Sequence, residues 1–357
     1  MSLAADQISF GFTAAAAGAD RRASDVERYA LMLEDCKVAY DLGYDVAWVL
    51  EHHFTDYYPT PSPLLVMSHL AAAFPGLSLG SSVIVAPWYQ PLRLAEEISM
   101  VSNLCSGELH LSFGRGTAKL EYDAFDVDMS EARERYSECM EILSKALSGE
   151  KFAHHGEHFQ IGREVVLRPT PKREKIHLYG AVGSEQSAPV NAEMGLPILC
   201  NSQFPPHVLA RIVAAWRQRA EQLKLQTNGI LPISANCLVG DSDEAAREEM
   251  RGYMATFFAL QADHYEADAN HWKDIEGYKQ FSKSFGNLRK LADPANLDGF
   301  LDYQLVGTPD TICQRIETLA ELGFNHFIVN CGKEGMPAEV RHDTYRRIAK
   351  EVAPAFR

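Results

Sequence analysis

The sequence lacks the marks of several large classes of protein. Its seven cysteines are scattered and none forms a C-x-x-C pair, so neither a zinc site nor a disulfide framework is indicated. No apolar run is long enough for an uninterrupted membrane span, and no basic segment followed by a long apolar stretch opens the chain. We therefore expect a cytoplasmic protein in a reducing setting, without a signal peptide, a membrane segment or a bound metal.

Basic residues are scarce relative to acidic ones. The 34 Lys and Arg residues stand against 48 Asp and Glu residues, which gives a formal net charge of −14. This balance opposes non-specific attraction to nucleic acid or to anionic lipid. It does not exclude an anionic ligand, because a few local arginines and backbone amides can bind a phosphate whatever the net charge. We expect a small-molecule partner, and no nucleic acid.

What the sequence has is a regular alternation of short apolar runs and helical patterns. Ser24 and Glu27 form a capping box before a helical pattern, and residues 46–50 form a continuous apolar run typical of a strand buried on both faces. Cap residues indicate two further helix starts: Asp241 with Glu244, and Thr308 with Pro309. Strands are expected at residues 8–12, 46–50, 77–85, 109–113, 176–182, 196–200, 230–239 and 327–330.

This alternation predicts the fold class. Repeated β-α units with apolar strands require a parallel sheet that is covered by helices. About eight such units favour a closed TIM (β/α)8 barrel over an open doubly wound sheet. The absence of a G-x-G-x-x-G after the first strand also argues against a Rossmann fold. Because α/β barrels of this length form one domain, we expect a single domain over residues 1–357.

Two segments interrupt the alternation. Residues 149–171 are polar, and Gly156, Gly162 and Pro169 within them predict an irregular insertion or a small hairpin. In residues 263–302 the pattern loosens and many side chains are polar or aromatic. Long segments without periodicity are uncommon inside a compact domain and often act as lids or binding loops. We expect a mobile loop there.

The first candidate for chemistry is a pair of histidines. In a TIM barrel the active site lies where the strands end at their C-terminal edge. Glu51-His52-His53-Phe54 comes directly after the strand at residues 46–50. A histidine there can act as a general acid or base, because its charge changes near neutral pH. Either histidine could instead only pack or hydrogen-bond in the barrel mouth. A metal site has less support, since acidic and histidine partners are sparse at the other strand ends.

The second candidate is Arg115, at the end of the strand at residues 109–113 and between Gly114 and Gly116. Glycines let the backbone come close to a ligand, and the guanidinium group suits a phosphate. A surface salt bridge is the alternative role for this arginine.

Two neighbouring strand ends complete the candidate site. Gly183-Ser184 follows the strand at residues 176–182 and precedes a helix that contains Ser187. Such a turn offers amides and hydroxyls to an anion, although Ser is also an ordinary N-cap. Paired with Arg115, it predicts a monophosphate site. Ser81, Ser82 and Val83 lie late in the third strand, where small residues leave room for a planar ring or simply pack within the strand.

Several stretches together resemble the bacterial luciferase-like flavin monooxygenases, over nearly the whole chain. They are Trp48-Val49-Leu50-Glu51-His52-His53-Phe54-Thr55, Pro91-Leu92-Arg93-Leu94-Ala95-Glu96-Glu97, Ser106-Gly107-Glu108-Leu109, Phe113-Gly114-Arg115-Gly116, and Gly183-Ser184 through Gly195-Leu196-Pro197. The resemblance implies a TIM barrel with an insertion that binds reduced FMN. It further implies reaction of the flavin with dioxygen to a C4a-peroxyflavin, which oxygenates a small organic substrate. A separate flavin reductase and a homodimer are implied as well.

The resemblance also implies roles for individual residues. His52 corresponds to the family's catalytic histidine, and Arg115 corresponds to its phosphate-binding arginine. Three residues join that arginine at the phosphate: Gly183, Ser184 and Ser187. Ser82 and Val83 fall where the family places a non-proline cis peptide beneath the flavin ring. Residues 263–302 match the family's mobile loop, which is expected to shield the peroxide from water.

Departures from the luminous members narrow the expectation. Light-emitting subunits carry a cysteine where Gly114 stands and a glutamate where Gly183 stands, so we expect a non-luminous member. Three alternatives stay open. The same fold could use a deazaflavin (F420) for hydride transfer without oxygen, or it could be a non-catalytic flavin-binding partner subunit. A metal-dependent barrel hydrolase is the remaining one.

Overall fold

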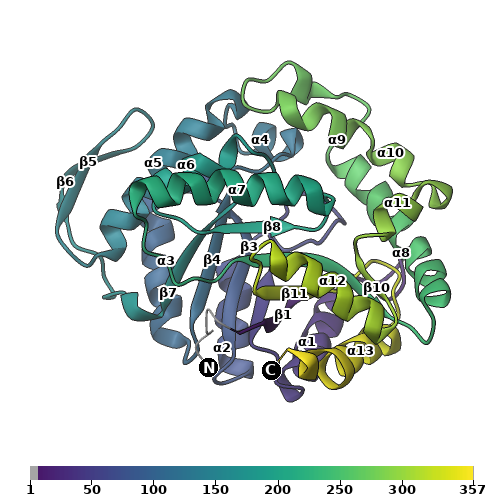
Figure 1. The fold of residues 1–357 in the computed structure, drawn as a ribbon. Coiled ribbons are helices and arrows are strands. Elements are labelled where there is room, and N and C mark those ends of the chain that lie inside the picture. Colours follow the sequence, from purple (N-terminus) through teal and green to yellow (C-terminus); the bar gives the residue numbers. More distant parts are fainter. Residues whose placement is uncertain (1–6, 357) are drawn as a thin grey trace.

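A computed structural model describes residues 7–356, apart from the side chain of Gln280, and its centre is a closed barrel of parallel strands surrounded by helices (Figure 1). The barrel strands are β1 (Ser9–Ala14), β2 (Val46–Val49), β3 (Ser78–Val85), β4 (Leu109–Gly114), β7 (Ile176–Ala181), β8 (Ile198–Asn201), β9 (Pro232–Val239) and β11 (His326–Asn330). Each pairs in parallel with the next, β8 pairs with β9, and β9 and β1 both pair with β11, which closes the circle. The expected TIM barrel is confirmed.

The strands are apolar on both faces because each face meets a different core. Outward-facing side chains pack under the helices, whereas a separate cluster fills the barrel: Val46, Trp48, Tyr179, Leu199, Ile230 and Ile328. Trp48 is fully buried there, and its Nε1 donates a hydrogen bond to Nε2 of His326 over 3.0 Å. Gly11 and Gly80 make room for this indole, since a Cβ at these positions would lie 2.7 and 2.6 Å from its atoms.

Helices connect and cover the strands. They are α1 (Asp25–Asp41), α2 (Pro63–Ala73), α3 (Pro91–Leu104), α4 (Lys119–Ala124), α5 (Ala132–Leu147), α6 (Ser187–Glu193), α7 (Pro206–Leu223), α8 (Asp243–His264), α12 (Pro309–Glu321) and α13 (Ala338–Arg347). The capping box of Ser24 and Glu27 and the Thr308 cap are both formed. The expectation for Asp241 is wrong, because Ser242 is the N-cap of α8 and accepts the backbone N–H of Ala245.

The two interrupting segments differ in structure. β5 (Phe152–His155) and β6 (Gln160–Val165) form an antiparallel hairpin that stands away from the barrel (Figure 1). Residues 265–304 contain single turns and three short helices: α9 (Ser282–Gly286), α10 (Leu288–Leu291) and α11 (Asp298–Leu301). A short strand follows, β10 (Leu305–Gly307), which pairs with β9 on the side away from β11. It is too short to stand out in the sequence.

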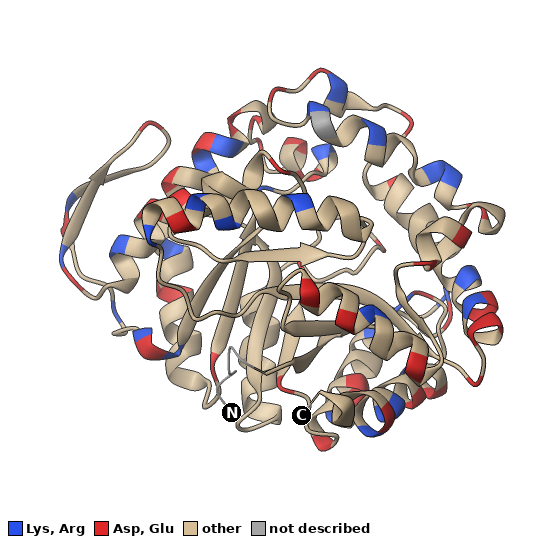
Figure 2. Cartoon of the chain, in the orientation of Figure 1, with Lys and Arg blue, Asp and Glu red and all other residues tan. Residues whose placement is uncertain are grey.

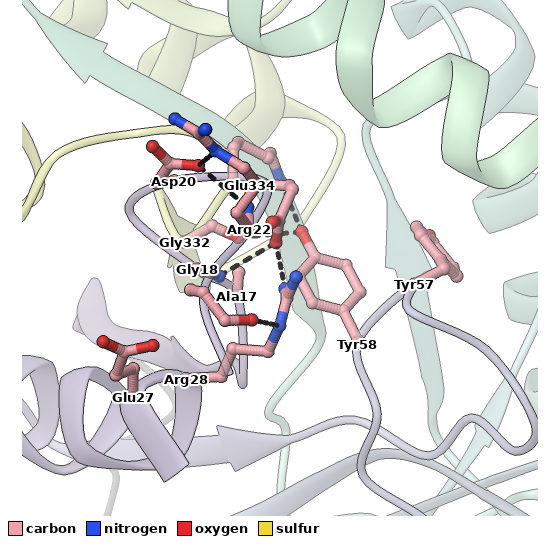
Figure 3. A network of polar contacts seen from close by, with 12 residues as sticks. Ala17, Gly18, Asp20, Arg22, Glu27, Arg28, Tyr57, Tyr58, Gly332 and Glu334 are labelled. Atoms are coloured by element: carbon pink, nitrogen blue, oxygen red, sulfur yellow. Dashed lines mark hydrogen bonds and ion pairs between the residues drawn. The ribbon is translucent and has the colours of Figure 1, made fainter. Parts of the chain in front are cut away.

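One buried ion pair and two hydrogen bonds connect the loop after β11 to the loop after β1, to α1 and to the loop after β2 (Figure 3). The guanidinium group of Arg28 pairs with Glu334, and the same carboxylate accepts the backbone N–H of Gly18 over 2.8 Å. Tyr58 donates its hydroxyl hydrogen to the carbonyl oxygen of Gly332 over 2.9 Å. These contacts hold the loop that follows His52 and His53 against the barrel mouth.

Charged side chains lie mainly on the helices and loops, whereas the barrel strands carry few of them (Figure 2). Within residues 7–356, none of the helices combines the length and the apolar character that a membrane crossing needs.

Candidate active site

A cavity of about 730 Å³ opens at the C-terminal ends of the barrel strands. Its volume falls in the range of small-molecule sites, which is roughly 300–1,000 Å³. Among its lining residues are six of the predicted site residues: His52, Ser82, Val83, Arg115, Gly183 and Ser187. Four neighbouring strand ends therefore contribute to one cavity. Ser184, the remaining predicted residue, does not line it.

His52 lies in the cavity wall against an acidic residue that the sequence did not single out. Its Nδ1 is 3.7 Å from Oε1 of Glu121, and Nε2 of His264 is 3.3 Å from the same oxygen. Burial lowers the pKa of His52, and Glu121 partly offsets this effect. The neutral imidazole is therefore favoured near neutral pH, which is the form that can accept a proton.

Glu121 is the fixed anion of this cluster. The short helix α4 carries it, and its Oε1 accepts the backbone N–H of His53 over 2.7 Å. Burial alone would raise the pKa of Glu121, but the hydrogen bonds and charges of His264 and His52 outweigh burial and lower it to about 2. The carboxylate is therefore ionised at neutral pH. Only tertiary folding brings these residues together, because α4 and the end of α8 are far from His52 in sequence.

His53 has a different environment from His52. Its Nε2 and Oε1 of Glu51 are 3.0 Å apart, and that carboxylate also accepts the backbone N–H of Val85 and the hydroxyl of Tyr89. The ring packs edge-on against Phe125 at 4.8 Å. This histidine is held by its structural partners, so the geometry distinguishes it from His52, the histidine to which the resemblance gave the catalytic role.

Arg115 presents a buried nitrogen that has no partner. Its Nη2 donates to the carbonyl oxygen of Gly277 over 3.3 Å, and the guanidinium group lies 4.9 Å from the centre of the Tyr278 ring. Its Nη1 is buried and has no hydrogen-bond partner among the described residues. Arg133, which the sequence did not single out, lines the same cavity. An anionic oxygen such as that of a phosphate fits this end of the cavity.

The remaining predicted residues have local roles in the structure. The hydroxyl of Ser184 contacts that of Ser187 at 3.1 Å, and Ser187 donates to the carbonyl oxygen of Ser184 over 2.9 Å. The serine turn is therefore satisfied within itself. The peptide bond between Ser82 and Val83 is cis, as the resemblance implied.

A second His–carboxylate cluster lies at the opposite ends of the strands. His110 in β4 pairs in register with His177 in β7, and Nε2 of each ring is 3.4–3.5 Å from Oε2 of Glu108. The three donor atoms lie within 4.8 Å of one another, a spacing that a divalent cation could bridge. This cluster is separate from the cavity.

Comparison with known proteins assigns the family. The sequence model of the luciferase-like monooxygenases matches residues 8–326. The chain belongs to the luciferase-like monooxygenase family. Among its relatives, y4wF of Sinorhizobium fredii is 27% identical over 91% of both chains. Another protein of that organism, y4vJ, is 38% identical, but the match spans 39% of this chain and 41% of that one. The oxygenase component of a flavin-dependent trigonelline monooxygenase from Acinetobacter baylyi is 21% identical, over 92% of this chain and 90% of that one.

Solved structures share the fold of this luciferase-like family member. Monooxygenase RslO1 from Streptomyces bottropensis superposes with a TM-score of 0.79 at 21% identity, over 98% of this chain and 99% of that one. With the same coverage, the oxygenating constituent of a diketocamphane monooxygenase from Pseudomonas putida, in complex with FMN, has a TM-score of 0.74 at 18% identity. An F420-dependent secondary alcohol dehydrogenase also has a TM-score of 0.74, at 16% identity and the same coverage. The fold therefore occurs with both cofactors.

Proposed function

We propose that this chain is the oxygenase component of a flavin-dependent monooxygenase, which uses reduced FMN and dioxygen to oxygenate a small organic substrate. A separate reductase would supply the reduced flavin, as the name of the trigonelline relative suggests for that protein. The proposed setting is a cytoplasmic homodimer of single-domain chains.

The observation that carries the proposal is the content of one cavity. A buried, unpartnered guanidinium nitrogen and a largely buried imidazole line the same space. Arg115 would bind the phosphate of FMN, with Arg133, Gly183 and Ser187 lining that space and Ser184 supporting Ser187. The cis peptide at Ser82 and Val83 would lie against the ring. This arrangement suits the binding of a nucleotide cofactor that carries a negatively charged group at one end and a reactive ring at the other.

His52 would accept and donate the proton that the reaction needs. Bound reduced FMN would supply the oxygen activation, through a C4a-peroxyflavin. His52 would exchange a proton with the reactants in the cavity, because its neutral form is favoured near neutral pH. Residues 263–302 would act as the mobile loop that excludes water, and Tyr278 and Phe285 from this segment already line the cavity.

Hydride transfer with F420 is the second candidate, since one structural neighbour uses that cofactor. The full-length sequence match to a flavin-dependent monooxygenase favours FMN. The two cofactors are distinguished by oxygen consumption, which only the first candidate requires.

Titration with FMN and riboflavin tests the phosphate assignment. Loss of one charge-assisted hydrogen bond costs about 1.5–3 kcal/mol, so Arg115→Ala should weaken FMN binding roughly ten- to a hundredfold. Riboflavin lacks the phosphate, and its binding should change little. Hydrogen exchange in residues 263–302 should slow when FMN binds, because Tyr278 lies against Arg115.

Arg163→Ala on the exposed hairpin strand β6 is the matched control, since it removes the same charge far from the cavity. Equal binding of FMN by the wild type and by Arg115→Ala would show that the phosphate assignment is wrong.

A further inference from the structure

We propose that Glu121 and His264 are positioning residues for His52. The two histidines share one carboxylate oxygen of Glu121, and this arrangement orients the His52 imidazole and sets how readily it takes up a proton. This inference rests on the proposed function, in which His52 is the catalytic residue. It adds two residues, one on α4 and one on α8, that are not among the site residues predicted from the sequence.

The geometry converges on Oε1 of Glu121. The backbone N–H of His53 donates to this oxygen over 2.7 Å, which fixes the carboxylate in place. His52 Nδ1 and His264 Nε2 approach it to 3.7 and 3.3 Å. Both nitrogens are buried, and neither has a hydrogen-bond partner among the described residues, so Oε1 of Glu121 is the acceptor that they approach. Buried polar atoms are rarely left without a partner, so the carboxylate is the acceptor that this arrangement offers them.

The rings are held in place by packing around them. The rings of His52 and His264 lie 5.1 Å apart and nearly perpendicular. Tyr57 packs 4.6 Å from the His52 ring and stacks on the His264 ring at 5.7 Å. Its hydroxyl accepts from Nε2 of Gln261, one turn before His264 on α8. The cluster therefore has little freedom to rearrange.

The charges around His52 act in opposite directions. Burial lowers the pKa of His52 most, Glu121 raises it, and His264 and His53 lower it. Tyr57 and Tyr265 also face the ring, and burial raises the pKa of both phenols, so neither becomes an anion near neutral pH. Glu121 is therefore the negative group in this environment. Removal of Glu121 and removal of His264 should shift the titration of His52 in opposite directions.

The arrangement also assigns the two ring nitrogens. Because Nδ1 is buried against Glu121, Nε2 is the nitrogen left for the cavity. In the proposed reaction Nε2 accepts a proton from a bound reactant and later returns it, while the hydrogen on Nδ1 stays directed at Glu121. Carboxylate–histidine pairs in catalytic sites fix the tautomer in this way. His264 is the last residue of α8, directly before the segment at residues 265–304 that covers the cavity. A change in the conformation of that segment can therefore affect His52 through the shared carboxylate.

Imidazole NMR of the cofactor-free protein tests this inference without any turnover. The pH titration of His52, assigned by comparison with His52→Gln, is recorded in EDTA so that no stray divalent ion bridges the cluster. We expect the proton of neutral His52 on Nδ1. Glu121→Gln should lower the titration midpoint by about one pH unit, a tenfold change in proton affinity, and His264→Gln should raise it. Glu121→Asp, which keeps the charge, should restore most of the midpoint.

Glu108→Gln is the matched control, because it removes a carboxylate beside two histidines at the other end of the barrel. It should leave the His52 midpoint unchanged. In the loaded enzyme, the pH at which the oxidation rate of reduced FMN is half-maximal should move with the NMR midpoint in each variant, while FMN affinity stays constant.

Two outcomes would overturn the inference. One is an unchanged His52 midpoint in Glu121→Gln or in His264→Gln, in proteins whose thermal unfolding matches the wild type. The other is a shift in the same direction on removing Glu121 and on removing His264, which a general loosening of the site would produce. Opposite NMR shifts together with no flavin oxidation in any variant would support the cluster and contradict the proposed function instead.

Discussion

Lys333 is a buried cation whose effect on stability can be measured. Its side chain is fully buried in the loop after β11, and Nζ contacts the side-chain oxygens of Asn330 at 2.8 Å and Tyr58 at 3.3 Å. The Phe257 ring lies 4.7 Å away. Among the described residues it makes no ion pair with a carboxylate within 4.0 Å. Burial lowers the pKa of Lys333 from 10.5 to about 7.

The sign of the pH dependence follows from this lowered pKa. Between pH 7 and 10.5 the unfolded chain binds a proton that the folded chain has released, so stability rises with pH across that window. The slope is about 1.4 kcal/mol per pH unit, and the full cost of the buried charge, about 5 kcal/mol, is present below pH 7. Lys333→Met removes the charge and should abolish this contribution.

Urea unfolding at several pH values measures the effect. The difference in unfolding free energy between Lys333→Met and the wild type should favour the variant at pH 7 and shrink by about 1.4 kcal/mol per pH unit up to pH 10. Other titrating groups cancel in this difference. The exposed Lys350→Met is the control and should show no slope. A constant difference between pH 7 and 10, whatever its size, would show that folding does not lower the pKa of Lys333.

Two further substitutions separate chemistry from packing. His52→Ala should bind FMN with an affinity within about twofold of the wild type. It should lose product formation while reduced flavin is still oxidised, because one proton-exchanging group contributes roughly 10²- to 10⁴-fold to the reaction rate. A parallel loss of FMN affinity would assign His52 to binding instead. Gly80→Ala should destabilise the barrel by about 1–3 kcal/mol in urea unfolding, since the new Cβ would lie 2.6 Å from Trp48. Gly252→Ala, on the open face of α8, should be neutral or stabilising, and equal effects of the two changes would contradict the packing argument.

The barrel was predictable because its signals are local. Continuous apolar strands, the capping box at Ser24 and the Thr308 cap each follow from a few adjacent residues, and all three are present in the structure. The cap at Asp241 was misassigned by one residue, because the neighbouring Ser242 competes for the same position. The short helices in residues 265–304 are held by packing and carry no clear periodicity.

The candidate site, too, could be predicted only where the sequence signal is local. His52 and Arg115 were found from their places after strands, which any barrel brings to one face. Glu121, His264 and Arg133 gave no comparable signal, because their positions depend on how α4, α5 and α8 pack over the cavity. Lys333 could not be found either, since nothing in the surrounding sequence marks it as buried.

The most direct measurement is a rapid-mixing experiment. The protein is first loaded with reduced FMN in the absence of oxygen, then mixed with oxygen-saturated buffer, and the absorbance spectrum is recorded over time. We expect a long-lived absorbance of an oxygenated flavin before oxidised FMN forms, and we expect His52→Ala to accelerate its decay. Two results together would contradict the proposed function. One is oxidation of reduced FMN no slower or faster than that of free flavin, and the other is hydride transfer between F420 and a substrate without oxygen uptake.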